Sequence, residues 1–186
     1  MEYDINVRVS NRHVHLKKET YELLFDEPLT KKYDLNQIGE FASNQTLTIR
    51  VGDKIIENVR VLGAFRKYDQ VEISKRDARM LGVNPPVRGS GELDDALEII
   101  LETEKAAVKV KGLIIANRHV HMSYDDAKKY GVKDKQKVGI KINNDKAGVV
   151  MAEIKVSDTG YYEVHFDTDD ANAFLIEDND KVKMIV

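Results

Sequence analysis

The 186-residue chain contains no cysteine. This absence excludes disulfide bonds, a cysteine nucleophile and thiolate metal ligands. No apolar run approaches the roughly 18 residues of a membrane-spanning helix, so no membrane segment is expected. The net charge of −3 argues against a nucleic-acid partner, because binding to nucleic acid normally needs a basic face. Met1-Glu2-Tyr3-Asp4 enters the first expected strand directly. No signal, transit or microcompartment-targeting extension is therefore expected, and the expected location is cytoplasmic.

Several familiar catalytic signatures are also missing. The sequence has no Gly-x-Gly-x-x-Gly, no P-loop, no Gly-x-Ser-x-Gly and no His-Glu-x-x-His. Because the chain has no cysteine, any metal must bind histidine, carboxylate, backbone or water. The remaining composition, 42% hydrophobic and 33% charged, is ordinary for a globular protein of one domain or two small ones.

One pentapeptide, Asn-Arg-His-Val-His, occurs twice, at residues 11–15 and 117–121, and it uses four of the five histidines. Each copy follows a run that is typical of a β-strand. If the strand continues, histidines two positions apart share a face, roughly 7 Å apart at Cα. Two imidazoles placed in this way can chelate zinc or another late first-row metal. A single such pair is more often solvated, but the exact repetition favours metal binding.

The repeat extends beyond the histidines and supplies a third ligand to each pair. Residues 71–78 match residues 164–171 as a strand followed by a capped helix, which aligns Glu72 with His165. The predicted metal ligands are the six residues His13, His15, Glu72, His119, His121 and His165. Three protein ligands leave a fourth position open, which is typical of catalytic zinc. Glu72 as an outward-facing carboxylate and His165 as a solvated histidine remain alternatives.

Elements in each half follow the same order: a strand, the histidine motif, a helix, several strands and a capped helix. Helices are expected over 17–25, 75–81, 123–130 and 168–174, and 30–45 is expected to be loop. Residues 92–105 fit either helix or strand. This duplicated pattern of short strands predicts two small β-barrels or sandwiches rather than a Rossmann sheet. The fold class is thus mainly β.

The sequence resembles the PduL-type phosphotransacylases (phosphate propanoyltransferases) over nearly its whole length. The matching segments are residues 11–16, 62–66, 70–74, 86–91, 117–122 and 165–172. Resemblance to this family implies two β-barrels capped by short helices, with a two-zinc site in the cleft between them. It implies one domain at 12–92, a second made of 1–11 plus 112–186, and a connecting segment at 93–111.

The resemblance also implies an activity: acyl-CoA plus phosphate in equilibrium with acyl phosphate plus coenzyme A. The expected enzyme is an acyltransferase of the phosphate propanoyltransferase or phosphate acetyltransferase type. Arg66 is implied as the catalytic residue that grips phosphate, with help from Ser90. The expected cofactors are two zinc ions, and coenzyme A is a substrate or product. Expected partners are acyl-CoA and phosphate, with homo-oligomerisation left open. Residues 92–96 are acidic, unlike the usual family pattern.

Two other functions fit the same residues. One is a zinc hydrolase that uses a metal-bound water on a thioester or phosphate ester. The other is a non-catalytic binding protein in which the metals stabilise the fold. Phosphate-dependent release of coenzyme A distinguishes the transferase from both.

Overall fold

The computed structural model describes residues 1–186 and divides them into two compact units. The first, here called the terminal barrel, consists of Met1–Asn11 and Asn117–Val186. The second, the central barrel, consists of Arg12–Ala116. Both boundaries fall at the repeated histidine motif, so the chain passes from one unit to the other at each copy.

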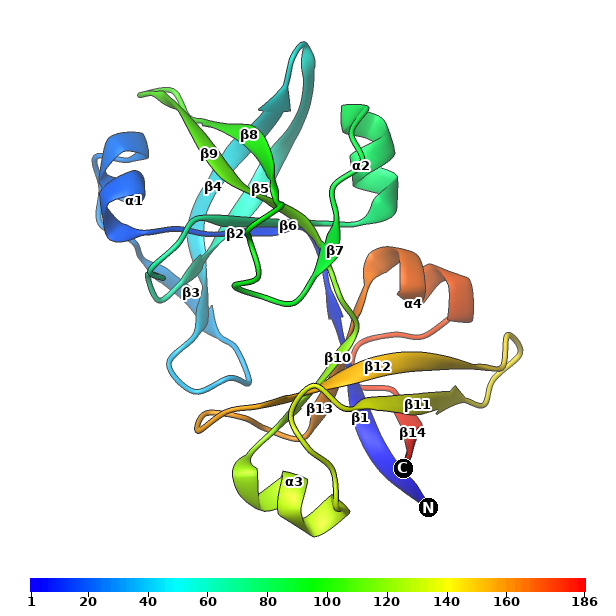
Figure 1. Ribbon diagram of the computed structural model, residues 1–186. Coiled ribbons are helices and arrows are strands. Elements are labelled where there is room, and N and C mark those ends of the chain that lie inside the picture. The colour runs from blue at the N-terminus through cyan, green and yellow to red at the C-terminus, as the bar shows by residue number, and fades with distance from the viewer. The chain divides into compact units, whose positions relative to one another are not determined.

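The terminal barrel is a closed sheet of six strands in the order β1-β13-β10-β12-β11-β14. The strands are β1 (Glu2–Ser10), β10 (His119–Met122), β11 (Lys137–Ile142), β12 (Gly148–Val156), β13 (Glu163–Asp167) and β14 (Lys181–Ile185). Strands β1 and β14 run side by side to the two ends of the chain (Figure 1). There the Met1 amino group donates to the Val186 carbonyl at 2.7 Å.

In the central barrel the main strand order is β3-β4-β5-β2-β6-β9-β7, and β8 pairs with both β4 and β9. This pairing closes six of its strands into a second barrel. The strands are β2 (His13–His15), β3 (Lys31–Asp34), β4 (Phe41–Val51), β5 (Lys54–Gly63), β6 (Gln70–Ile73), β7 (Val87–Arg88), β8 (Leu97–Glu102) and β9 (Ala107–Ala116). The expected mainly β fold with two barrels is confirmed.

Each barrel has its own hydrophobic core. Val14, Val61 and Val71 are fully buried in the central core, and Val120 and Val164 are fully buried in the terminal core. Val14 and Val120 are the central residues of the two His-Val-His segments. Because side chains alternate along a strand, burying these valines places the flanking histidines on the opposite face. The core thereby orients the candidate metal ligands.

Four short helices accompany the strands: α1 (Lys18–Leu24), α2 (Lys75–Leu81), α3 (Tyr124–Tyr130) and α4 (Thr168–Phe174). Helix α2 begins with a capping box between Ser74 and Asp77 and ends at Gly82, whose φ is 72°. A left-handed conformation of this kind favours glycine. Before helix α3, the Ser123 side chain accepts from the Asp126 backbone N–H, and Gly131 follows the helix with a φ of 68°. The four expected helices are confirmed.

The expected loop over residues 30–45 is wrong. Lys31–Asp34 forms β3, and β4 already begins at Phe41. Strand β3 is exposed throughout and lies at the edge of its sheet, so no apolar alternation marks it. In β4 the early buried positions include polar Ser43, whose hydroxyl donates to the Val61 carbonyl at 2.7 Å. Because its hydroxyl is hydrogen-bonded to the neighbouring strand, the polar Ser43 can occupy a buried position. The alternation of apolar and polar residues that usually indicates a strand is interrupted there.

Residues 92–105, which fitted helix or strand, contain strand β8. The segment 93–111, expected to connect the domains, supplies β8 and the first part of β9 to the central barrel. These strands pair with each other and with β4 and β6. Side chains such as Ile99 and Leu101 are buried in that barrel's core.

Candidate metal centres and anion-binding residues

Each histidine motif forms part of a square of four side chains on two paired strands. In the central barrel, antiparallel β2 and β6 place His13 opposite Glu72 and His15 opposite Gln70. In the terminal barrel, antiparallel β10 and β13 place His119 opposite His165 and His121 opposite Glu163. Side chains opposite each other on antiparallel strands lie close together on one face. The two barrels therefore present homologous squares.

The central square brings together the three predicted ligands of this barrel. Donor atoms of His13, His15 and Glu72 all lie within 4.8 Å of one another. The Nε2 atom of His13 is 3.5 Å from Oε2 of Glu72, and both side chains are 12% exposed. The fourth member, Gln70, is fully buried and donates from Nε2 to Oε1 of Glu72 at 2.5 Å. Gln70 therefore fixes the orientation of the carboxylate.

The terminal square brings together His119, His121 and His165, whose donor atoms also lie within 4.8 Å of one another. The Nε2 atoms of His119 and His121 are 3.1 Å apart. Nδ1 of His119 lies 2.8 Å from the Asn117 carbonyl. Because a carbonyl only accepts, Nδ1 carries the proton there, and Nε2 remains available as a ligand atom. The Tyr161 hydroxyl is 2.9 Å from Nε2 of His165.

Both donor sets fit zinc. Zinc binds imidazole nitrogen and carboxylate oxygen at about 2.0–2.2 Å, so neighbouring ligands of a tetrahedral site lie roughly 3.3–3.5 Å apart. The separations of 3.1 Å between His119 and His121 and 3.5 Å between His13 and Glu72 are close to this range. All five histidines of the chain belong to the two sets.

The arginine of each motif forms a two-point ion pair with an aspartate. Arg12 reaches Asp77 through Nε at 3.1 Å and Nη2 at 2.9 Å. Arg118 reaches Asp170 through the same atoms at 2.8 and 2.7 Å. The hydrogen bond from Arg118 to Asp170 raises the pKa of the arginine. Each aspartate lies in the first turn of the helix that follows the third ligand, Glu72 or His165.

Arg66 and Ser90, the residues expected to bind phosphate, both lie in the central barrel. The Arg66 guanidinium forms an ion pair with Glu40, and its backbone N–H donates to the Leu16 carbonyl at 2.8 Å. Ser90 Oγ accepts from Gln70 Nε2 at 3.1 Å. Because the same Gln70 nitrogen donates to Glu72, Ser90 is linked by hydrogen bonds to the central metal set. Arg66 instead lies beside a carboxylate.

A family model for phosphate propanoyltransferase matches residues 6–177. The chain belongs to the phosphate propanoyltransferase family. It is 47% identical to a phosphate propanoyltransferase of Thermotoga maritima, over 97% of this chain and 89% of the relative. It is 45% identical to the phosphate propanoyltransferase of Lachnoclostridium phytofermentans, over 94% and 84%, and 42% identical to that of Salmonella typhimurium, over 91% and 82%. The chain is an acyltransferase enzyme.

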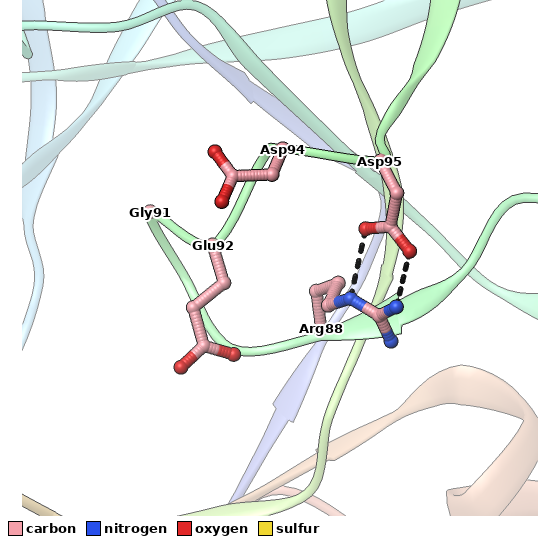
Figure 2. Close-up of a pocket in the computed structure, with 5 residues that line it drawn as sticks. All are labelled: Arg88, Gly91, Glu92, Asp94 and Asp95. Carbon is pink, nitrogen blue, oxygen red and sulfur yellow. Dashed lines mark hydrogen bonds and ion pairs between the residues drawn. The ribbon is translucent and has the colours of Figure 1, made fainter.

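In this phosphate propanoyltransferase family member, β7 ends at Arg88 and the loop after it carries several acids (Figure 2). Arg88 donates from Nε to Oδ1 of Asp95 at 2.9 Å, and its Nη2 contacts Oδ2 of the same carboxylate. Glu92 accepts from the Gly89 backbone N–H at 3.1 Å. These residues, with Gly91 and Asp94, line a surface pocket. The Arg88 charge is therefore balanced within the loop by Asp95.

Sequence reasoning missed four residues that contact the candidate metal ligands or the arginines of the motifs: Gln70, Asp77, Glu163 and Asp170. A signal for them exists in the repeat itself. Asp77 and Asp170 occupy equivalent positions in the matched strand-helix segments, as Arg12 and Arg118 do in the motif. Gln70 and Glu163 are also equivalent, two residues before the third ligand.

No helix of the chain has the length and apolar character that spanning a membrane requires.

Proposed function

We propose that the chain exchanges coenzyme A and phosphate on a short-chain acyl group. The observation that carries this proposal is the phosphate propanoyltransferase family match over residues 6–177, which includes all six candidate ligands. In the forward reaction a phosphate oxygen attacks the thioester carbonyl. The new carbon–oxygen bond forms as the carbon–sulfur bond breaks, and the thiolate leaves as coenzyme A. Reversal forms acyl-CoA from acyl phosphate.

Two zinc ions are the proposed cofactors. His13, His15 and Glu72 would hold one, and His119, His121 and His165 would hold the other. A bound zinc would supply a Lewis acid, able to polarise a carbonyl or bind an anionic oxygen. Gln70 supports this proposal through its hydrogen bond, which holds Glu72 in one orientation. The Asn117 carbonyl does the same for His119 through Nδ1.

Arg66 and Ser90 are the proposed phosphate-binding residues. The planar fork of a guanidinium matches phosphate oxygens and stabilises negative charge that develops during transfer. Arg66 binds an anionic group, the carboxylate of Glu40, so phosphate would have to displace this carboxylate to reach the guanidinium. The Ser90 hydroxyl can donate to phosphate while it accepts from Gln70. Holding both reactants supplies much of the rate.

The deciding experiment follows free thiol from propanoyl-CoA or acetyl-CoA in zinc-loaded protein, with and without phosphate. Thiol release that requires phosphate and stops after chelation supports the transferase. Release without phosphate indicates the hydrolase. No release from either substrate, with two metals bound, indicates a different acyl substrate or metals that only stabilise the fold.

Arg66→Gln tests the phosphate site and Arg50→Gln is its matched control. Both arginines pair with a glutamate of the central barrel, Glu40 and Glu102 respectively. We expect Arg66→Gln to lower kcat/KM for phosphate by about 100-fold or more, in line with loss of a charged stabilising donor. Arg50→Gln is expected to keep kcat/KM within a few-fold of the unaltered enzyme. Equal activity in both variants contradicts the assignment of Arg66.

A further inference from the structure

The two squares differ at their fourth corner. Gln70 occupies this corner in the central barrel, opposite His15, and Glu163 occupies it in the terminal barrel, opposite His121. Glutamine is neutral and glutamate is charged. In the central square the one carboxylate is the ligand Glu72. In the terminal square the three ligands are all imidazoles, and the one carboxylate is Glu163.

We propose that Glu163 is a positioning residue of the terminal metal site, where its carboxylate supplies the negative charge that the three histidines lack. Its Oε2 lies 3.4 Å from Nε2 of His165, and its side chain is 5% exposed. Glu163 and His165 lie two positions apart on β13 and so share a face. A carboxylate that accepts from the ring nitrogen not bound to metal orients a ligand imidazole and raises its basicity, which strengthens metal binding. With Glu163 at Nε2, this role requires His165 to bind the metal through Nδ1.

The charges around Glu163 support this role. Arg8 is the cation beside it, with Nε 3.7 Å from Oε2 of Glu163. The same guanidinium contacts Oδ2 of Asp178 through Nη1 at 2.5 Å, which is much the shorter contact. Glu163 and Asp178 thus share the Arg8 guanidinium. Because a buried carboxylate is costly unless it is compensated, a divalent cation in the histidine set would add to the compensation that Arg8 gives Glu163.

Three uncharged groups also lie against His165 when the histidines are neutral. These are the rings of His119 and His121, with centroids 4.9 and 4.6 Å away, and the Tyr161 hydroxyl. On the neighbouring strand β12, Glu153 and Lys155 stand in register with His119 and His121. Within the two squares, each barrel offers a cation one carboxylate: Glu72 as a ligand in the central barrel, and Glu163 beside a ligand in the terminal one.

The inference rests on the metal binding proposed above, and a binding measurement without substrates tests it separately from acyl transfer. His13→Ala in the full chain disables the central set, so that only the terminal set binds zinc with high affinity. Zinc affinity is then measured by competition with a chromophoric chelator. In this background we expect Glu163→Gln to weaken zinc binding by about 10- to 100-fold, the usual cost of losing such an outer carboxylate.

Arg8→Gln distinguishes a charge effect from a purely structural ion pair. If Glu163 acts through its charge, removal of the Arg8 guanidinium leaves affinity unchanged or tighter, whereas Glu163→Gln weakens it. If the pair only stabilises the barrel, both variants weaken zinc binding together, and the proposal is overturned. Glu163→Asp keeps the charge and is expected to bind more tightly than Glu163→Gln. It replaces Glu163→Gln in the comparison with Arg8→Gln if the glutamine variant does not fold.

Glu2→Gln is the matched control. Glu2 belongs to the same barrel and pairs with Lys141 at 2.9 Å on the surface. Its loss changes the net charge by the same amount and is expected to leave zinc affinity within twofold. The proposal is overturned if the zinc affinity of Glu163→Gln stays within twofold of that of the His13→Ala background. It is also overturned if Glu2→Gln loses as much zinc affinity as Glu163→Gln.

Discussion

Arg118 and Asp170 are joined by two parallel contacts, 2.8 Å from Nε to Oδ2 and 2.7 Å from Nη2 to Oδ1. This pair ties the residue before His119 to the first turn of α4, directly after the strand that carries His165. Arg12 and Asp77 make the same connection between the motif of the central barrel and α2. Each pair thus joins two segments that supply metal ligands, and each occurs at the same position of the repeat.

Loss of these aspartates is predicted to destabilise the protein unequally. The Asp77 side chain is 2% exposed and also accepts from the Ser74 backbone N–H, whereas the Asp170 side chain is 15% exposed. We expect Asp77→Asn to lower the free energy of unfolding by about 2 kcal/mol and Asp170→Asn by about 1 kcal/mol. Urea unfolding of metal-free protein measures both. A larger loss in Asp170→Asn would falsify this ranking.

His121→Ala is predicted to remove one bound metal and, with it, the acyl-transfer activity. Val120→Ala is the matched control, because Val120 is fully buried in the core beside it but offers no donor atom. We expect Val120→Ala to lower Tm and to keep two metals per chain. Metal content by elemental analysis, taken with the thiol assay, separates the two outcomes. Full activity in His121→Ala would refute the assignment of the terminal site.

Stability at alkaline pH is predicted to depend on Tyr21 of α1. Burial raises the pKa of Tyr21 to about 12 from its ordinary value of 10.0, and the hydroxyl donates to the Glu27 carbonyl at 3.0 Å. Because the folded pKa is the higher one, the contribution is complete below pH 10 and is lost as the pH rises from 10 to 12. The loss is at most about 3 kcal/mol for two pKa units.

Tyr21→Phe isolates this contribution. The free energy of unfolding of the unaltered chain, minus that of Tyr21→Phe, is expected to decrease between pH 10 and pH 12 and to be flat from pH 7 to pH 9. Chemical denaturation at each pH gives both values. A flat difference across the whole range shows that Tyr21 titrates alike in the folded and unfolded chain.

The parts of the fold that the sequence predicted depend on local rules. Ser74, Asp77 and Gly82 mark the ends of α2 within a few residues of one another, and the alternation around Val14 places both histidines on one face. Repetition then brought Glu72 and His165 into the candidate metal sets. Each of these inferences needed only neighbouring positions or a comparison of one half with the other.

The missed features depend on contacts between distant segments. Arg12 and Asp77 are 65 residues apart, and Arg118 and Asp170 are 52 apart. Neither residue type identifies its partner. Strand β3 was missed because it is an exposed edge with no buried face. The opposition of Glu163 to His121 required the register of β10 and β13, which no single segment contains.

The passage of the chain between barrels at each histidine motif sets an order for folding during synthesis. Residues 12–116 are contiguous, so the central barrel can form while the rest of the chain is still being made. Strand β1 is made before the central barrel, yet its two partners, β13 and β14, are made after it. At roughly 5–20 residues per second, β1 waits about 10–35 seconds for them. A strand made before the central barrel therefore finds its partners only after the whole of that barrel has been made.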